Sequence, residues 1–279
     1  STPSNSSAAS DVYKRQGQVP VDTLIVQLEK LVKKEPKNYQ AYFNLGTAYL
    51  NKNMFEKSIE CYKKAISIKP DFAEAHNNLG ILYYTQGKLD DAIKEFEDAV
   101  KYNSKLAEAF NYLGMAYLGK GNVDKAISSH WSAIKLNPES YTYYSNLGFD
   151  YYKKGDFKNA GYCYQKSVFF KPDFVRGYNN LGRSYFNMGR YKEAVRQFKK
   201  AIYVNPVVIN PRYNLVITYL KMKRYSDALD ELDKIAKLNL TDVQVIYLQD
   251  YSGFDNELLD VSVNEIKSAI KKNKQFLEP

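Results

Sequence analysis

A short pattern recurs every 34 residues along most of the chain, and this period limits the possible folds more than any other feature of the sequence. Five copies contain the dipeptide Leu-Gly, and a sixth, degenerate copy reads Leu215-Val216. The Leu-Gly copies begin at Leu45, Leu79, Leu113, Leu147 and Leu181. A fixed period of about 20–50 residues indicates supersecondary units that stack on one another. We therefore expect an array of repeats, in which each unit buries its apolar face against its neighbours.

Each period contains the signals of two helices separated by a tight turn. A tyrosine follows each Leu-Gly or Leu-Val dipeptide by three residues, and small and aromatic residues recur in the second half of the period. Spacings of three and four place such residues on one face of a helix. A helix stop with positive φ favours glycine, and proline cannot continue a helix. The expected turn residues are Asn53, Gly87, Gly121, Gly155, Gly189 and Lys223, and the closing prolines are Pro70, Pro138, Pro172 and Pro206.

This pattern resembles the tetratricopeptide repeat, with six consecutive units over residues 39–242. The units start near Tyr39, Ala73, Ala107, Tyr141, Val175 and Ile209. The resemblance implies an all-α fold, a right-handed superhelical solenoid of 34-residue helix–turn–helix repeats. It also implies that the first helices line a concave groove that binds another protein or a peptide, which makes the chain a scaffold rather than an enzyme.

The two ends of the chain depart from the repeat. Residues 6–16, SSAASDVYKRQ, resemble the translation of a sequencing-library adapter, so we expect residues 1–16 to be a non-native leader and the natural coding sequence to begin upstream. Residues 17–38 fit the second helix of a repeat cut in half. Residues 243–279 are expected to form a C-terminal cap that includes an amphipathic helix over 256–276.

No catalytic, metal or cofactor site is expected. The histidines, His76 and His130, stand at repeat positions that face the core between helices. Cys61 and Cys163 lack the spacing of metal ligands. The glycines follow the repeat and not a phosphate-binding motif, and no apolar run approaches the roughly 18 residues of a membrane span.

The candidate binding residues are asparagines and cations on the first helices. We call the second residue of each Leu-Gly or Leu-Val dipeptide the Gly slot. Two positions before it, five of the six units carry asparagine, and Tyr112 interrupts the series. The superhelical region of O-linked N-acetylglucosamine transferases has a similar asparagine ladder, and an amide can both donate to and accept from a peptide backbone. The expected groove residues are Asn44, Asn78, Asn146, Asn180, Asn214, Lys153, Arg176, Arg183 and Lys221. Asn-Leu-Gly is also frequent in the repeat consensus for structural reasons.

The charge is unevenly distributed. Residues 151–224 carry 16 basic and three acidic side chains, whereas residues 225–279 carry six basic and 11 acidic side chains. The basic segment favours an acidic or polar extended partner along repeats four to six, although the acidic segment can also neutralise it.

Two further functions remain open. The chain can be the repeat region of a larger enzyme, such as a glycosyltransferase, whose catalytic domain is missing. The basic segment can also bind nucleic acid, but we do not expect this partner, because most tyrosines are assigned to the repeat core and not to exposed stacking platforms.

Overall fold

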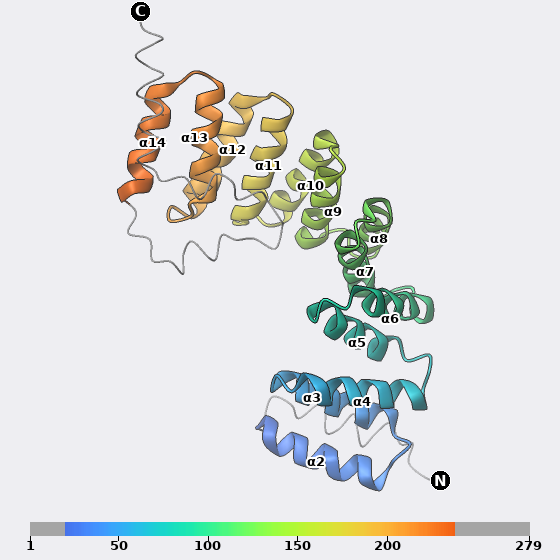
Figure 1. Cartoon of the computed structure of the whole chain (residues 1–279). Helices are drawn as coiled ribbons and strands as arrows, with labels where there is room; N and C mark the ends of the chain where they lie inside the picture. Colours follow the sequence, from blue (N-terminus) through green and yellow to red (C-terminus); the bar gives the residue numbers. More distant parts are fainter. Residues whose placement is uncertain (1–19, 238–279) are drawn as a thin grey trace, which may run out of the picture. The chain divides into compact units, whose positions relative to one another are not determined.

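The computed structural model of the chain describes residues 20–237, which form 13 α-helices without a β-strand (Figure 1). The expected leader (1–16) and the expected cap (243–279) lie outside the described residues. The first helices of the six units are α3 (Tyr39–Asn51), α5 (Ala73–Thr85), α7 (Ala107–Gly119), α9 (Tyr141–Lys153), α11 (Val175–Asn187) and α13 (Asn210–Lys221). The second helices are α4 (Phe55–Ile68), α6 (Leu89–Tyr102), α8 (Val123–Leu136), α10 (Phe157–Phe170), α12 (Tyr191–Val204) and α14 (Tyr225–Lys237). A further helix, α2 (Val21–Lys34), precedes them and packs against α3.

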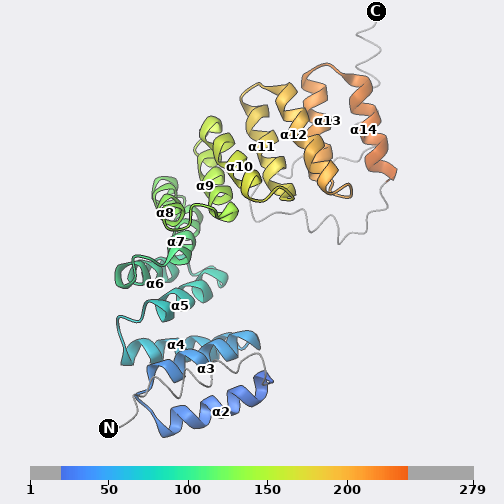
Figure 2. The same ribbon diagram turned by 180° about the vertical axis from the view of Figure 1, so that it is seen from behind.

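The chain divides after Pro138 into two compact units. Helices α2–α8 belong to the first unit and α9–α14 to the second. Within each unit, every helix packs against the next one along the chain, as the two opposite views in Figures 1 and 2 show. This consecutive packing confirms the all-α solenoid of helix–turn–helix repeats that the 34-residue period predicts.

The turns inside the repeats have the geometry that the sequence predicts. All six expected turn residues have positive φ: Asn53, Gly87, Gly121, Gly155, Gly189 and Lys223. In the third unit, the amide of Gly121 donates to the Leu118 carbonyl at 2.8 Å, and that of Asn122 donates to the Tyr117 carbonyl at 2.9 Å. This pair of bonds satisfies two of the carbonyls left open at a helix end, and it requires a left-handed residue at the turn.

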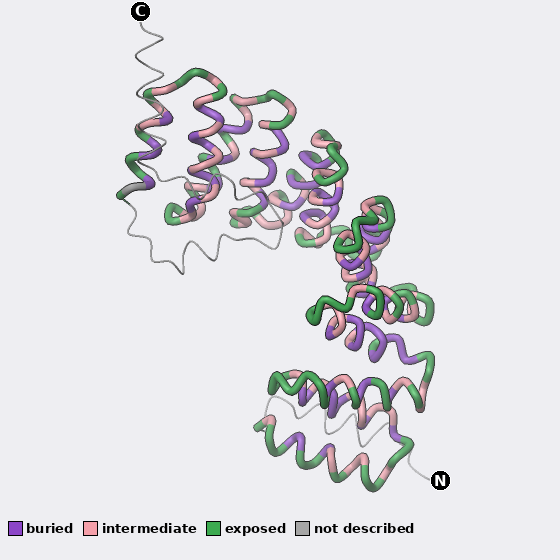
Figure 3. The backbone as a smooth tube through the Cα atoms, in the orientation of Figure 1, coloured by how far each residue is buried: buried purple, intermediate pink, exposed green. Residues whose placement is uncertain are grey.

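The core between paired helices depends on the Gly slot. A Cβ added at Gly80 would lie 2.7 Å from the ring of Phe96, which is fully buried in the facing second helix. The same contact occurs at Gly46, Gly114, Gly148 and Gly182, against Tyr62, His130, Tyr164 and Phe198. The absence of a side chain therefore lets an aromatic ring pack closely against the first helix. Figure 3 shows the resulting pattern, in which each helix buries one side and the turns stay exposed.

Candidate functional site

In each unit, one pair of first helices from successive repeats is also in contact. Besides the consecutive contacts, α5 packs against α7 in the first unit and α11 packs against α13 in the second. No pair of second helices within residues 20–237 makes comparable contact. The face that these first helices share is therefore the candidate binding surface.

In the first unit, the two predicted asparagines are engaged with neighbouring side chains. Asn44 is only 1% exposed and accepts a hydrogen bond from Gln40 at 3.2 Å. Asn78 is half-buried and donates to the hydroxyl of Tyr62 at 3.4 Å. The Asn44 amide is thus held within α3, whereas the Asn78 amide links α5 to α4.

In the second unit, the three predicted asparagines differ in their accessibility. Asn180 is 6% exposed, whereas Asn146 and Asn214 are half-buried. Asn214 on α13 donates to the side-chain carbonyl of Asn179 on α11 at 2.8 Å. This bond links two neighbouring first helices and orients both amides on their shared face.

A polar cluster on α9 and α11 surrounds the hydroxyl of Tyr152. Arg183 donates to this oxygen at 3.3 Å, and its guanidinium carbon lies 5.1 Å from the centre of the tyrosine ring. Asn187 donates to the same oxygen at 2.7 Å. The two bonds and the cation–π contact restrain the Arg183 side chain, so less conformational entropy is lost when it binds a ligand.

Two members of this cluster, Tyr152 and Asn187, are not among the residues predicted from the sequence. Tyr152 lies 31 residues before Arg183 and 35 residues before Asn187, so the cluster joins two different repeats. The only sequence signal is that a 34-residue period brings residues near that separation together on adjacent first helices.

The remaining predicted cations lie at the surface of the second unit. Lys153, Arg176 and Lys221 are exposed, at the end of α9, the start of α11 and the end of α13. Lys153 Nζ lies 5.5 Å from the centre of the Phe149 ring. Together with Arg183, these residues give the first helices of this unit a basic character.

The described residues contain no group of ligands suited to a metal ion. His76 and His130 are 5% and 0% exposed, which confirms that they face the core. Burial raises the pKa of Cys61 and of Cys163 to about 12, so both thiols stay protonated near neutral pH and are poor nucleophiles. None of the helices in residues 20–237 is both long and apolar enough to span a bilayer.

Comparison with known proteins points to one repeat family. Profiles described as TPR repeat and tetratricopeptide repeat match residues 28–60, 47–87, 77–130, 149–189 and 175–206. No curated protein matches the sequence significantly.

Solved structures extend the comparison to the fold. A crystal structure of MamA protein is 32% identical, with a TM-score of 0.57 over 60% of this chain and 92% of that one. The crystal structure of YrrB, a TPR protein with an unusual peptide-binding site, is 19% identical, with a TM-score of 0.61 over 67% of this chain and 96% of that one. The Cut9–Hcn1 hetero-tetramer of APC/C is also 19% identical, with a TM-score of 0.59 over 84% of this chain and 46% of that one. The last two similarities concern the fold alone.

The 34-residue period, the positive-φ turns and the ring seated on each Gly slot thus occur together with profile matches in both units. This fold is typical of non-catalytic scaffolds that bind other proteins. The chain belongs to the tetratricopeptide-repeat family.

Proposed function

We propose that this protein is a scaffold that binds an extended, acidic or polar segment of a partner protein along the first helices of its second unit. The cluster around Tyr152 carries the proposal, because it holds the guanidinium of Arg183 in a restrained position on that face. A restrained arginine favours a carboxylate, with which it can form two parallel hydrogen bonds.

The neighbouring residues extend this surface in both directions. Asn179 and Asn214, bonded to each other, supply amide groups beside the cluster. Lys153, Arg176 and Lys221 add exposed positive charge. Cations of this kind raise the rate at which an acidic segment meets the surface, while amides fix the register of its backbone.

The experiment compares two double charge reversals in the full chain. Arg176→Glu with Arg183→Glu reverses two charges on the face of the first helices. Lys192→Glu with Lys199→Glu, both exposed on the second helix α12, changes the net charge by the same amount. Binding of a fluorescent aspartate- and glutamate-rich peptide is measured by anisotropy, with a lysine-rich peptide of equal length as the negative control.

We expect the first pair to weaken binding of the acidic peptide at least about tenfold. The second pair should weaken binding of the acidic peptide about threefold or less, because salt screens charges that lie far from the bound peptide. Equal losses in both variants would show that only the total charge matters, and the proposed site would then be wrong.

A further inference from the structure

The most exposed aromatic side chains of the described residues lie away from the proposed peptide site, on two second helices of the second unit. Tyr203 on α12 is 78% exposed, and Phe169 and Tyr162 on α10 are 72% and 50% exposed. Rings of this size are normally buried in a repeat array, as Tyr164 and Phe198 on the same two helices are. Their exposure needs an explanation other than the core.

The exposed rings alternate with cations in a pattern that both helices share. On α10, Tyr162, Lys166 and Phe169 follow one another at intervals of four and three, which places them along one side of the helix. One period later, α12 presents Arg196, Lys200 and Tyr203 at the equivalent positions. We call these six residues the outer basic-aromatic stripe.

Acidic side chains are nearly absent from this surface. Helices α10 and α12 carry six cations between them and one acid, Glu193. Glu193 is already paired with Arg190, at 2.7 and 2.9 Å. The outer basic-aromatic stripe therefore suits a partner that carries several negative charges.

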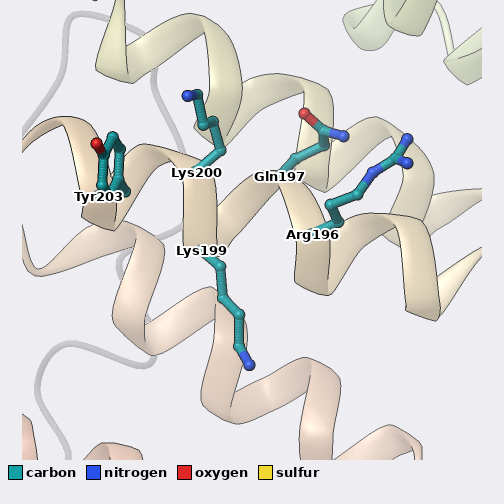
Figure 4. Close-up of a pocket in the computed structure, with 5 residues that line it drawn as sticks. All are labelled: Arg196, Gln197, Lys199, Lys200 and Tyr203. Atoms are coloured by element: carbon teal, nitrogen blue, oxygen red, sulfur yellow. The ribbon is translucent and has the colours of Figure 1, made fainter.

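Two of the cations lie over one face of a neighbouring ring. Lys200 Nζ lies 5.0 Å from the centre of the Tyr203 ring, and Lys166 Nζ lies 5.8 Å from that of Tyr162. Figure 4 shows the side chains that line a shallow depression along α12, with Lys200 standing between Tyr203 and Arg196 and with Lys199 pointing the other way. An aromatic face and a positive charge are thus offered to the same ligand.

The Phe169 ring packs against neighbouring aromatic rings. It makes an edge-to-face contact with Phe170 at 5.2 Å between ring centres, and Phe170 in turn stacks on Tyr144 of α9 at 5.7 Å. Because these contacts restrict the Phe169 side chain, little of its conformational entropy is lost when a flat ligand stacks on it.

We propose that the outer basic-aromatic stripe binds single-stranded nucleic acid. Non-specific single-strand binding combines cations that follow the phosphates with aromatic rings on which bases stack, and this stripe supplies both. A protein partner fits less well, because lysine is depleted at the centre of protein interfaces but is a common phosphate ligand. Although most tyrosines belong to the repeat core, Tyr162 and Tyr203 are exposed and can serve as platforms for stacked bases.

The test measures binding of a fluorescent 12-nucleotide single-stranded DNA and the matching RNA to the full chain by anisotropy, at several salt concentrations. Phe169→Ala with Tyr203→Ala removes the two most exposed rings without changing the charge. Phe55→Ala with Tyr102→Ala is the matched control, because both rings are 40% exposed on second helices of the first unit. Circular dichroism checks that each variant keeps its helices.

We expect the Phe169 and Tyr203 variant to lose at least about 30-fold in affinity with an unchanged salt slope, and the control to lose less than about threefold. Arg196→Ala with Lys200→Ala should instead reduce the salt slope by the phosphates it no longer contacts. Equal affinity of the two aromatic variants would overturn the proposal. So would absence of binding by the wild-type chain at low salt, or a polyglutamate chain of equal charge that binds as tightly and depends on the same rings.

Discussion

His76 and Arg212 occupy the same position in repeats that are four periods apart, and each joins a glutamate of the second helix to a proline carbonyl before the first helix. The Nδ1 atom of His76 lies 2.7 Å from Glu95 Oε2, and its Nε2 atom lies 2.9 Å from the Pro70 carbonyl. Both neighbours are acceptors, so both ring nitrogens must carry a proton to satisfy them. The corresponding partners of Arg212 are Glu231 and the Pro206 carbonyl.

These contacts predict that the free energy of unfolding falls as the pH rises above the ordinary histidine pKa. Burial disfavours the charged ring, but the hydrogen bonds to Glu95 and Pro70 outweigh it and raise the pKa of His76 above its ordinary value. A raised folded-state pKa contributes stability that is complete below the unfolded pKa of about 6.5 and is lost as the pH rises through the folded value.

The measurement compares the urea midpoints of the wild-type chain and His76→Arg between pH 6 and pH 9. Arginine keeps its charge over this range and already fills the equivalent position in Arg212. We expect the midpoint of the wild type to fall relative to that of the variant as the pH rises. A constant difference between the two would contradict the imidazolium assignment.

At Gly148 there is no room for a side chain between the paired helices α9 and α10. A Cβ at this position would lie 2.9 Å from Cε1 of Tyr164, whose ring is fully buried. We expect Gly148→Leu to lower the free energy of unfolding by about 1–3 kcal/mol or more, because overpacking forces the two helices apart. Exposed Lys158→Leu on α10 is the control, and similar denaturation midpoints for both variants would refute the role of the Gly slot.

Two buried tyrosines at the same repeat position should respond differently to loss of the hydroxyl. The Tyr62 hydroxyl hydrogen-bonds with Thr47 at 3.1 Å and accepts from Asn78 at 3.4 Å. The Tyr164 hydroxyl is buried without a hydrogen-bond partner among the described residues, and burial raises its pKa far above the ordinary value.

Tyr62→Phe should therefore cost about 1 kcal/mol, whereas Tyr164→Phe should be neutral or stabilising, because it removes an unsatisfied polar group. Phe96 and Phe198 show that this position accepts phenylalanine. Thermal unfolding of the two variants measures the difference, and a larger loss for Tyr164→Phe would contradict the structure.

The repeat core is predictable from the sequence because its contacts are set by spacing along the chain. Tyr151 follows Gly148 by three residues and Leu147 by four, so a helix places Tyr151 on the same side as both. The positive φ of the turn residues follows from the same period, and it holds even where Asn53 and Lys223 replace glycine.

The surfaces are less predictable, because they depend on which side chains meet across repeats. The period brings Tyr152 near Asn187 and Arg183, but nothing in the sequence indicates that its hydroxyl accepts hydrogen bonds from both. The period marks Tyr185 as a repeat position, but it does not indicate how exposed Tyr203 is. The asparagine ladder shows the same limit, since the period places Asn44 and Asn146 equivalently but only the first is fully buried.

Site-specific crosslinking can determine whether the partner segment lies along the first helices of the second unit. A photoreactive residue replaces either Asn187, exposed on α11, or Tyr203, exposed on α12. Each labelled chain is irradiated with the acidic peptide, and the crosslinked fraction is measured by mass spectrometry. We predict a strong crosslink at position 187, suppressed by Arg176→Glu with Arg183→Glu, and little at position 203. Crosslinks confined to position 203, or equal at both positions, would show that the segment does not lie along the first helices.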